Sequence, residues 1–448
     1  MRMEIAQARQ PEKTESVEKN IMYLWCLRML LPCGGYRKFV EKKSFSSDEV
    51  VAVLGLEAYA DKDVKHADAI RKLKRMHADA EQHGFSYPPV LQDNLAHLLD
   101  RISLNRVETD ILIFSILLHT ETGLEECADT LGSLDKSKLI RFLSIILGYP
   151  QRDIAKALTM TGQLALSGLL RIDSSWTRNM DSKLDLMQGF ADNLRAPDMD
   201  ASRLFIGSFR EGSEPKLGYE SFAHVSKPYA LIKTYLEQAR QQTTGVNILL
   251  HGEPGTGKTE MVRTLVKDAG TVLYEISMED ADGVPLSSKE RFSAYQLSQQ
   301  VLCHTPGAVI MFDEIEDVFP ERSLFDKPKP GNTEKKAWIN NLLESNKVPA
   351  FWLSNRVHHI DPAFLRRFDY VLEMPAPTNR MREQIFINYL DNVSVSEPWL
   401  KRMSANRNLL PAHIEKAAKV VRHVATKSAN ANETVLEHVL EGTQEILK

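Results

Sequence analysis

The stretch "NILLHGEPGTGKTEMVRTLVKDA", residues 247–269, decides the fold. It opens with an apolar run of strand length, passes through a glycine-rich turn, and continues with the apolar spacing of a helix. Inside it, Gly252 is followed by four residues and then by Gly257, Lys258 and Thr259, which is the phosphate-binding loop pattern in a strand–loop–helix setting. The stretch therefore predicts an α/β fold with a parallel sheet and a phosphate site.

The chemistry of this loop follows from its residue types. Glycines let backbone N–H groups turn toward phosphate oxygens at a helix N-terminus. Lys258 is placed to reach the β- and γ-phosphates, and the Thr259 hydroxyl to ligate Mg²⁺. We therefore expect ATP and Mg²⁺ as cofactors. The loop residues expected to hold the nucleotide are Gly252, Glu253, Pro254, Gly255, Thr256, Gly257, Lys258, Thr259 and Glu260.

Two acidic residues end a second apolar run, "AVIMFDE", residues 308–314. Asp313, at the end of that predicted strand, can hold the nucleotide's magnesium together with Thr259, while Glu314 can orient and deprotonate an attacking water. An acidic turn after a buried strand would explain the charges, but not their order and place after a phosphate loop. Nucleotide hydrolysis is therefore predicted, and not binding alone.

A third polar position ends the run "PAFWLSN", residues 349–355. In a doubly wound sheet the carboxyl ends of the strands face the ligand crevice, so Asn355 is placed to touch the γ-phosphate or the attacking water. Asn also ends strands for reasons of turn geometry, which is the alternative interpretation.

The texture of the sequence changes along the chain. Short apolar runs alternate with helical stretches after about residue 220, which indicates a parallel sheet with crossover helices, whereas the earlier part carries apolar residues at helical spacing. The divisions we expect are a flexible N-terminus 1–20, a mostly helical N-terminal domain 21–173, a linker 174–217, an α/β P-loop core 218–377 and a helical C-terminal part 378–448.

Composition sets further bounds. The chain has 448 residues, 43% of them hydrophobic, and a formal net charge of −4, so it has no overall attraction for nucleic acid or anionic membrane. Its four cysteines form no CxxC pair, which favours reduced thiols and a reducing compartment. The apolar run 21–33 is too short to span a bilayer and follows a polar segment. We expect a cytoplasmic protein with no membrane partner.

Together these motifs resemble the AAA family of ATPases over about residues 218–425. "GEPGTGKT" is similar to its Walker A motif, "IMFDEIED" to its Walker B motif, Asn355 to its sensor 1, and "IDPAFLRRFD" to its second region of homology. By this resemblance Arg366 and Arg367 fall where arginine fingers lie. Such fingers would enter the neighbouring subunit's site and stabilise charge on the transferring phosphoryl group. The resemblance thus implies a ring oligomer, in this family commonly a hexamer.

The remaining parts resemble the family less uniformly. Residues 378–448 look like its C-terminal lid, with Pro411 and Ala412 where some members have an arginine, and Phe222 to Val225 resemble the segment that lines the base pocket. The segment 278–292 has no aromatic residue at the expected tip of a pore loop, which puts threading of a protein chain in doubt. The stretch 319–338 is longer than the family's usual connection, and we expect a mobile surface loop.

The end of the N-terminal half, residues 149–173, reads as helix, turn, helix and strand, a layout similar to a winged helix. A recognition helix at 161–168 would offer no Arg or Lys to DNA. Two functions stay open: an ATPase ring that remodels or assembles a protein partner, which we favour, and a DNA-associated AAA ATPase such as a loader or a mobile-element or defence accessory. A third is a ring that binds ATP mainly to assemble a scaffold.

Overall fold

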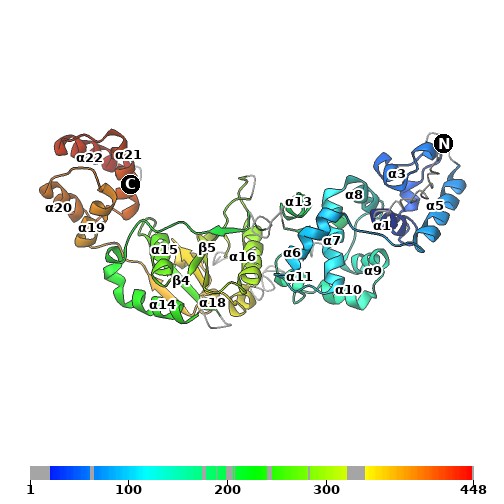
Figure 1. Cartoon of the computed structure of the whole chain (residues 1–448), viewed down its shortest axis with the longest axis horizontal. Coiled ribbons are helices and arrows are strands. Elements are labelled where there is room, and N and C mark those ends of the chain that lie inside the picture. Colours follow the sequence, from blue (N-terminus) through cyan, green and yellow to red (C-terminus); the bar gives the residue numbers. More distant parts are fainter. Residues whose placement is uncertain are drawn as a thin grey trace, which may run out of the picture.

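The computed structural model describes residues 21–60, 65–173, 178–187, 189–197, 205, 207–239, 245–280, 283–319 and 339–445. The expected flexible N-terminus and all but the first residue of the loop 319–338 lie outside these ranges. The molecule is elongated, with a helical N-terminal unit, an α/β core and a C-terminal group of helices following one another along its length (Figure 1).

The N-terminal unit is built from helices, as the apolar spacing of this region indicates. They are α1 (Ile21–Leu30), α2 (Tyr36–Phe39), α3 (Asp48–Leu54), α4 (Glu57–Ala60), α5 (His66–Ala80), α6 (Pro89–Leu99), α7 (Arg106–Thr120), α8 (Thr122–Asp129), α9 (Lys136–Leu147), α10 (Gln151–Ala157) and α11 (Gln163–Leu166). Helix α7 begins at an Asn105–Glu108 capping box, and residues 111–118 are all buried. A helix apolar on every side lies inside a core, and α7 is the centre of this unit.

The stretch 174–217, expected to be a linker, differs from that expectation in its described part. It contains α12 (Met180–Lys183), β2 (Leu184–Leu186) and α13 (Phe190–Arg195), and β2 pairs antiparallel with β1 (Leu170–Ile172). Met180, Leu184 and Phe190 are buried in the core of the N-terminal unit. These elements are short and their other faces are polar. The segment therefore has the polar, Gly- and Pro-containing composition of a linker, although its few apolar residues are buried.

The segment with the winged-helix layout faces the α/β core. Helix α11 has four residues, and the Ala165 carbonyl accepts a 3.2 Å hydrogen bond from Gln296 Nε2 of α16 (Ser288–Leu302). Arg171 of β1 donates to the Lys289 carbonyl of the same helix at 3.1 Å. Leu297 and Val301 of α16 also belong to the apolar core of the N-terminal unit. One helix of the α/β core is therefore packed into both units.

The α/β core has a six-stranded sheet in the order β3-β5-β6-β7-β4-β8. The strands are β3 (Phe209–Glu211), β4 (Asn247–His251), β5 (Val272–Ile276), β6 (Ala308–Phe312), β7 (Ala350–Ser354) and β8 (Tyr370–Glu373). The short apolar runs expected to be strands after about residue 220 are confirmed as β4 to β8 and pair in parallel, while the unpredicted β3 joins the edge antiparallel to β5. The predicted α/β fold with helical parts is thus confirmed.

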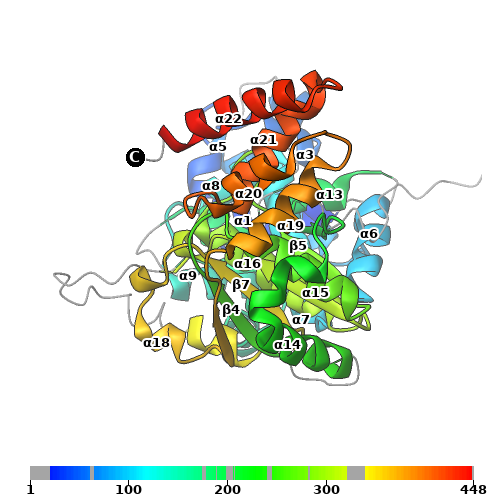
Figure 2. The same cartoon turned by 90° about the vertical axis from the view of Figure 1, so that its left-hand side faces the viewer.

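Helices cover both faces of this sheet and form a group after it. Alongside α16 the core has η2 (Tyr219–Val225), α14 (Ser226–Ala239), α15 (Lys258–Asp268), η3 (Ile315–Asp317), η4 (Val357–His359) and α18 (Pro362–Leu365). The C-terminal group consists of α19 (Asn379–Leu390), α20 (Glu397–Ala405), α21 (Pro411–Val424) and α22 (Ala429–Glu445), and it lies above α15 in Figure 2. Its buried residues join the apolar cluster that covers one face of the sheet. Within the described ranges, no helix has the length and apolar character needed to cross a membrane.

Candidate functional site

The glycine-rich loop joins the end of β4 to the start of α15. Gly257 is the N-cap of α15 and has a φ of 93°, in the left-handed region that favours glycine. A Cβ atom on Gly252 would lie 2.5 Å from the Met374 carbonyl oxygen, so that position has no room for a side chain. The loop therefore takes its shape because its glycines can follow the backbone where other residues could not.

Lys258 is the first residue of α15 and is buried, with 6% of its surface exposed. Its Nζ donates hydrogen bonds to the carbonyl oxygens of Gly252 at 2.9 Å and Glu253 at 3.0 Å, and to Asn355 Oδ1 at 2.8 Å. Burial lowers the pKa of Lys258, and the nearby carboxylates of Asp313 and Glu316 partly oppose that shift. These three oxygens hold the ammonium group at the mouth of the loop.

Thr259 and Asp313 meet across the gap between α15 and β6. Thr259 Oγ1 donates to Asp313 Oδ2 at 3.1 Å. Burial raises the pKa of Asp313, while hydrogen bonds from the Glu314 backbone N–H and from Thr259 act in the opposite direction. A hydroxyl and a carboxylate oxygen fit Mg²⁺, which is usually held by one or two protein groups together with substrate phosphates. The described residues contain no cluster of three or more His, Cys, Asp or Glu suited to a metal.

Glu314 lies directly after Asp313, with its side chain exposed and facing the same cavity. Its φ of 52° and ψ of 56° place a residue with a Cβ in the left-handed region, which is unfavourable for L-residues. Its backbone N–H donates to Asp313 Oδ1 at 2.9 Å, and its carbonyl accepts from Arg291 Nη1 at 3.3 Å. Such local strain is found most often at functional sites.

Asn355 follows β7, and the sheet order explains how it reaches Lys258. Strand β7 lies between β6 and β4, so the carboxyl ends that carry Asp313, Asn355 and the loop are neighbours. The Asn355 backbone N–H donates to Glu316 Oε1 at 3.1 Å, which fixes this position against η3.

These groups line one cavity of about 350 Å³. The expected residues among its walls are Pro254, Gly255, Gly257, Lys258, Thr259, Glu260, Asp313, Glu314 and Asn355. Gly252 and Glu253 contribute carbonyls to Lys258, and the Thr256 hydroxyl donates to the Glu253 carbonyl at 3.0 Å within the loop. The structure thus brings the predicted phosphate, magnesium and water-activating groups to one place.

Comparison with known proteins agrees with this geometry. Residues 248–376 match the model of the "ATPase family associated with various cellular activities (AAA)". These residues are an AAA domain. The match includes the phosphate loop, both acidic residues, Asn355 and the Arg366–Arg367 pair, and it supports ATP hydrolysis as the chemistry of the domain.

Curated relatives match the same part of the chain. "Proteasome-activating nucleotidase 1" of Halobacterium salinarum is 27% identical over an alignment of 216 residues that covers 41% of this chain and 50% of that protein. "Protein SAV" of Sulfolobus acidocaldarius is 30% identical over 34% of this chain and 20% of that protein, and "Cell division control protein 48 homolog B" of Arabidopsis thaliana is 30% identical over 33% and 26%. The chain thus spans half or less of the length of these relatives.

The two arginines of the AAA domain lie away from its own cavity. Arg366 is the C-cap of α18 and is exposed; Arg367 is also exposed and forms an ion pair with Glu344. Neither is among the described residues that line the cavity. The structure of one chain therefore does not bring these two predicted site residues together with the others.

The C-terminal helices close the cavity of the AAA domain from the other side. Pro411 and Ala412, at the start of α21, line the cavity, and the Ala412 N–H donates to the Gly255 carbonyl at 3.4 Å. Tyr389 of α19 lines it as well. The expected base-pocket segment is placed differently: Phe222 is buried behind the loop, and the earlier Leu217 lines the cavity instead.

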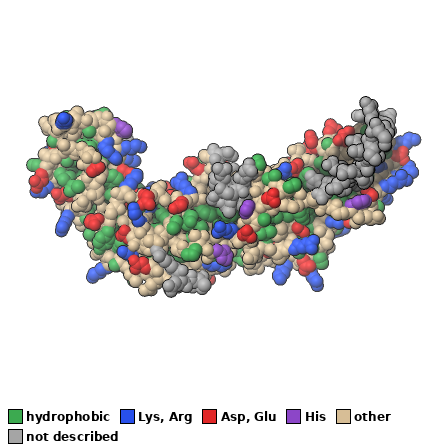
Figure 3. Space-filling model, in the orientation of Figure 1, with side chains coloured by type: hydrophobic (Ala, Val, Ile, Leu, Met, Phe, Trp, Pro, Cys, Tyr) green, Lys and Arg blue, Asp and Glu red, His purple; other side chains and the backbone are tan. Residues whose placement is uncertain are grey.

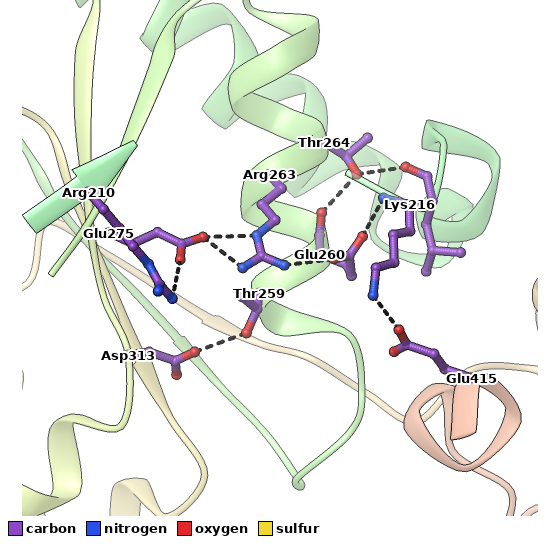
Figure 4. A network of polar contacts seen from close by, with 10 residues as sticks. Arg210, Lys216, Thr259, Glu260, Arg263, Thr264, Glu275, Asp313 and Glu415 are labelled. Carbon is purple, nitrogen blue, oxygen red and sulfur yellow. Dashed lines mark hydrogen bonds and ion pairs between the residues drawn. The ribbon is translucent and has the colours of Figure 1, made fainter. Parts of the chain in front are cut away.

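A charged network that contributes Lys216, Glu260, Arg263 and Glu415 to the wall of the cavity joins the AAA domain to the C-terminal helices (Figure 4). Arg263 donates to Glu260 Oε1 at 3.0 Å and twice to Glu275 Oε1, at 3.0 and 2.7 Å. Glu260 Oε2 accepts from the Lys216 backbone N–H at 2.8 Å, and Lys216 Nζ donates to Glu415 Oε1 of α21 at 2.5 Å. Sequence reasoning missed Lys216, Arg263, Glu275 and Glu415, because nothing in a sequence marks pairing between segments as distant as Lys216 and Glu415.

Proposed function

We propose that this protein is a cytoplasmic ATPase that assembles into a ring, commonly a hexamer in this family, and couples ATP hydrolysis to remodelling or assembly of a protein partner. The observation that supports a ring is the separation of the site into two parts. Lys258, Asp313 and Glu314 converge on one cavity, whereas Arg366 and Arg367 are exposed elsewhere on the same domain. Arg263, the arginine that lines the cavity, is paired with Glu260 and Glu275. A second copy of the chain can supply Arg366 and Arg367 to the cavity.

The proposed roles follow from the contacts. Lys258 binds the β- and γ-phosphates, and Thr259 and Asp313 hold the magnesium that accompanies ATP and neutralises phosphate charge. Glu314 accepts a proton from the attacking water, whose position Asn355 helps to fix. Arg366 or Arg367 of the neighbouring subunit stabilises the charge that develops on the transferring phosphoryl group.

A protein partner is favoured over DNA by three observations. The segment expected to hold a recognition helix contacts α16 through Ala165. Basic and acidic side chains are interspersed over the face shown in Figure 3, unlike the basic stripe typical of DNA-binding proteins. One relative is named for proteasome activation and another for cell division control. These names describe those proteins, and they are compatible with a protein as the partner. Chain threading is not part of the proposal, because the exposed large hydrophobic residues in the described part of segment 278–292 are Met278 and Val284, and neither is aromatic.

The test combines the rate of ATP hydrolysis, the mass of the oligomer in solution and the capture of a client by a variant that does not hydrolyse ATP. We expect the purified chain to hydrolyse ATP in a Mg²⁺-dependent way and to form an oligomer in solution. Tagged Glu314→Gln should bind ATP without turnover, because an amide cannot accept the proton of water, and should retain its client while ATP is present. Glu397→Gln, which changes an exposed glutamate of α20, is the matched control and should turn over normally.

The outcomes separate the alternatives. A defined protein retained by Glu314→Gln after nuclease treatment, and released on removal of ATP, supports remodelling or assembly. Partners that disappear with nuclease point to the DNA-associated ATPase. A monomer that hydrolyses ATP at the full rate at all concentrations contradicts the ring, and a negligible rate in an ATP-bound oligomer points to the scaffold.

A further inference from the structure

Arg291 lies behind the two acidic residues of the cavity, on a helix that the motifs do not include. It is in the first turn of α16, which starts from a Ser287–Glu290 capping box, and only 2% of it is exposed. Its guanidinium carbon is 4.6 Å from the ring centre of Phe312, the last residue of β6. The side chain therefore points into the protein and packs against the last residue of β6.

The guanidinium binds the backbone of both acidic residues. Nη2 donates to the Asp313 carbonyl, and Nη1 donates to the Glu314 carbonyl at 3.3 Å. Guanidinium groups are planar and present their donors in a fixed geometry, so two carbonyls bound at once are held in a defined relative orientation. These are the carbonyls on either side of the Glu314 N–H and Cα, where the backbone is left-handed.

We propose that Arg291 is a positioning residue for ATP hydrolysis, which holds the Asp313–Glu314 backbone in the left-handed turn that directs the Glu314 carboxylate into the cavity. The proposal rests on the proposed ATPase function and adds to it a residue that does not line the cavity. A left-handed backbone at a residue with a Cβ is unfavourable unless its surroundings impose it. In the described structure Arg291 constrains the Glu314 backbone through its two hydrogen bonds to the carbonyls. The Asp313 side chain adds a second constraint by accepting a hydrogen bond from the Glu314 N–H.

A purely structural role for Arg291 predicts something different. If the side chain only satisfies two buried carbonyls, its loss lowers stability and leaves the kinetics of the folded enzyme unchanged. If it positions Glu314, its loss lowers kcat while ATP affinity stays, because Lys258 and the loop that bind the phosphates do not depend on it. The split between kcat and binding therefore separates the two roles.

The experiment uses the full chain with Arg291→Met, Arg291→Lys and Gln299→Met. Methionine keeps an unbranched side chain over Phe312 without donors, and lysine keeps the charge but can serve the two carbonyls only as a point charge. Gln299 is the matched control: it is on the same helix, is also buried, and hydrogen-bonds the Val348 carbonyl and N–H away from the acidic pair. The measurements are kcat and KM for ATP, the Kd of ATP by calorimetry, and the thermal midpoint.

We expect kcat of Arg291→Met to fall about 10- to 100-fold, the scale of a small misplacement of a catalytic group. Its Kd for ATP should stay within about twofold of wild type, and kcat of Arg291→Lys should lie between the two. Gln299→Met should keep the wild-type kcat even if its thermal midpoint falls.

A folded Arg291→Met protein with wild-type kcat overturns the proposal, as does an equal fall of kcat in Gln299→Met. If the methionine variant does not fold, Arg291→Lys decides: wild-type kcat overturns the proposal, and reduced kcat with unchanged Kd supports it. The wild-type rate is measured first, so absence of any hydrolysis there is a failure of the proposed function and is not confused with failure of Arg291.

Discussion

The side chains of Lys258 and Asn355 are joined by a 2.8 Å hydrogen bond from Nζ to Oδ1, although 97 positions separate them. They meet because β4 and β7 are parallel neighbours whose last residues, His251 and Ser354, are paired in register. A polar residue that ends one strand is thereby fixed to the cation that follows another. If Lys258 binds a phosphate as proposed, that phosphate would lie within reach of Asn355.

Lys258→Ala should lower the affinity for ATP by about 100-fold or more, because a buried ammonium that hydrogen-bonds a phosphate is among the stronger single contacts. Calorimetric titration of ATP measures this. Lys267→Ala removes a lysine from the same helix that is exposed and paired with Glu214, and it should leave the Kd unchanged. Equal affinities in the Lys258 variant and wild type would remove Lys258 from the phosphate site.

Arg366→Ala and Arg367→Ala should each be tested by mixing with Lys258→Ala protein. Each arginine variant keeps an intact cavity but supplies no finger to its neighbour. Lys258→Ala keeps both arginines but has an inactive cavity. If the arginines act between subunits, co-assembled rings should hydrolyse ATP faster than the average of the separate proteins.

The variant whose activity is recovered by mixing identifies the primary finger of the two. Arg380→Ala, an exposed arginine on α19, is the control and should have wild-type activity alone. Loss of hydrolysis that mixing does not restore, in rings shown to contain both proteins, would argue for an effect within one chain.

Lys216→Met should weaken ATP binding modestly by loosening the C-terminal helices that close the cavity. The Lys216–Glu415 ion pair is largely exposed, so its loss should cost no more than about 1 kcal/mol, or about fivefold in Kd. Exchanging the charges, Lys216→Glu with Glu415→Lys, should recover part of the affinity. Lys401→Met, which breaks the exposed Lys401–Glu397 pair within α20, should have no effect on Kd.

The protein should lose stability as the pH falls below about 6.5, in part through His413. His413 is buried, and its Nδ1 accepts from the Leu410 N–H at 3.3 Å at the start of α21. Burial lowers the pKa of His413 from its ordinary value of 6.5, and burial lowers the pKa of His224 and His251 as well. The unfolded chain then binds more protons than the folded one, so the free energy of unfolding decreases from the ordinary pKa down to the lowered one.

Denaturant unfolding across about pH 5 to pH 8 checks this dependence. His413→Asn keeps an acceptor for Leu410 without a titrating group, so its unfolding free energy should fall less steeply in acid. His97→Asn, an exposed change on α6, should keep the wild-type slope. A slope in His413→Asn as steep as in wild type would remove His413 from the acid response.

Much of the α/β core could be predicted because its signals are local. The five parallel strands are short apolar runs, and the loop before α15 carries its glycines and Lys258 within a few residues. Strand β3 could not be predicted in the same way: Phe209, Arg210 and Glu211 are partly exposed and are a strand only because β5 pairs with them.

The site divides similarly. Asp313, Glu314 and Asn355 are recognisable because each ends an apolar run, and the sheet order then brings them together. Arg291 and Lys216 carry no such mark, since an arginine in the first turn of a helix and a lysine after a proline are ordinary surface residues in a sequence. Their roles depend on contacts with Asp313 and with Glu415, which only the folded chain provides.

Helix α16 belongs to two cores at once, with Leu297 and Val301 in that of the N-terminal unit and Phe292 and Tyr295 in that of the sheet. The chain is consequently less modular than its motifs indicate. Exchange of its first half for that of another ATPase, in the laboratory or by recombination, would leave apolar side chains of α16 facing a surface that did not evolve with them. Inheritance of the two halves should therefore be linked, and a chimera would have to carry the outer face of this helix together with its donor's N-terminal unit.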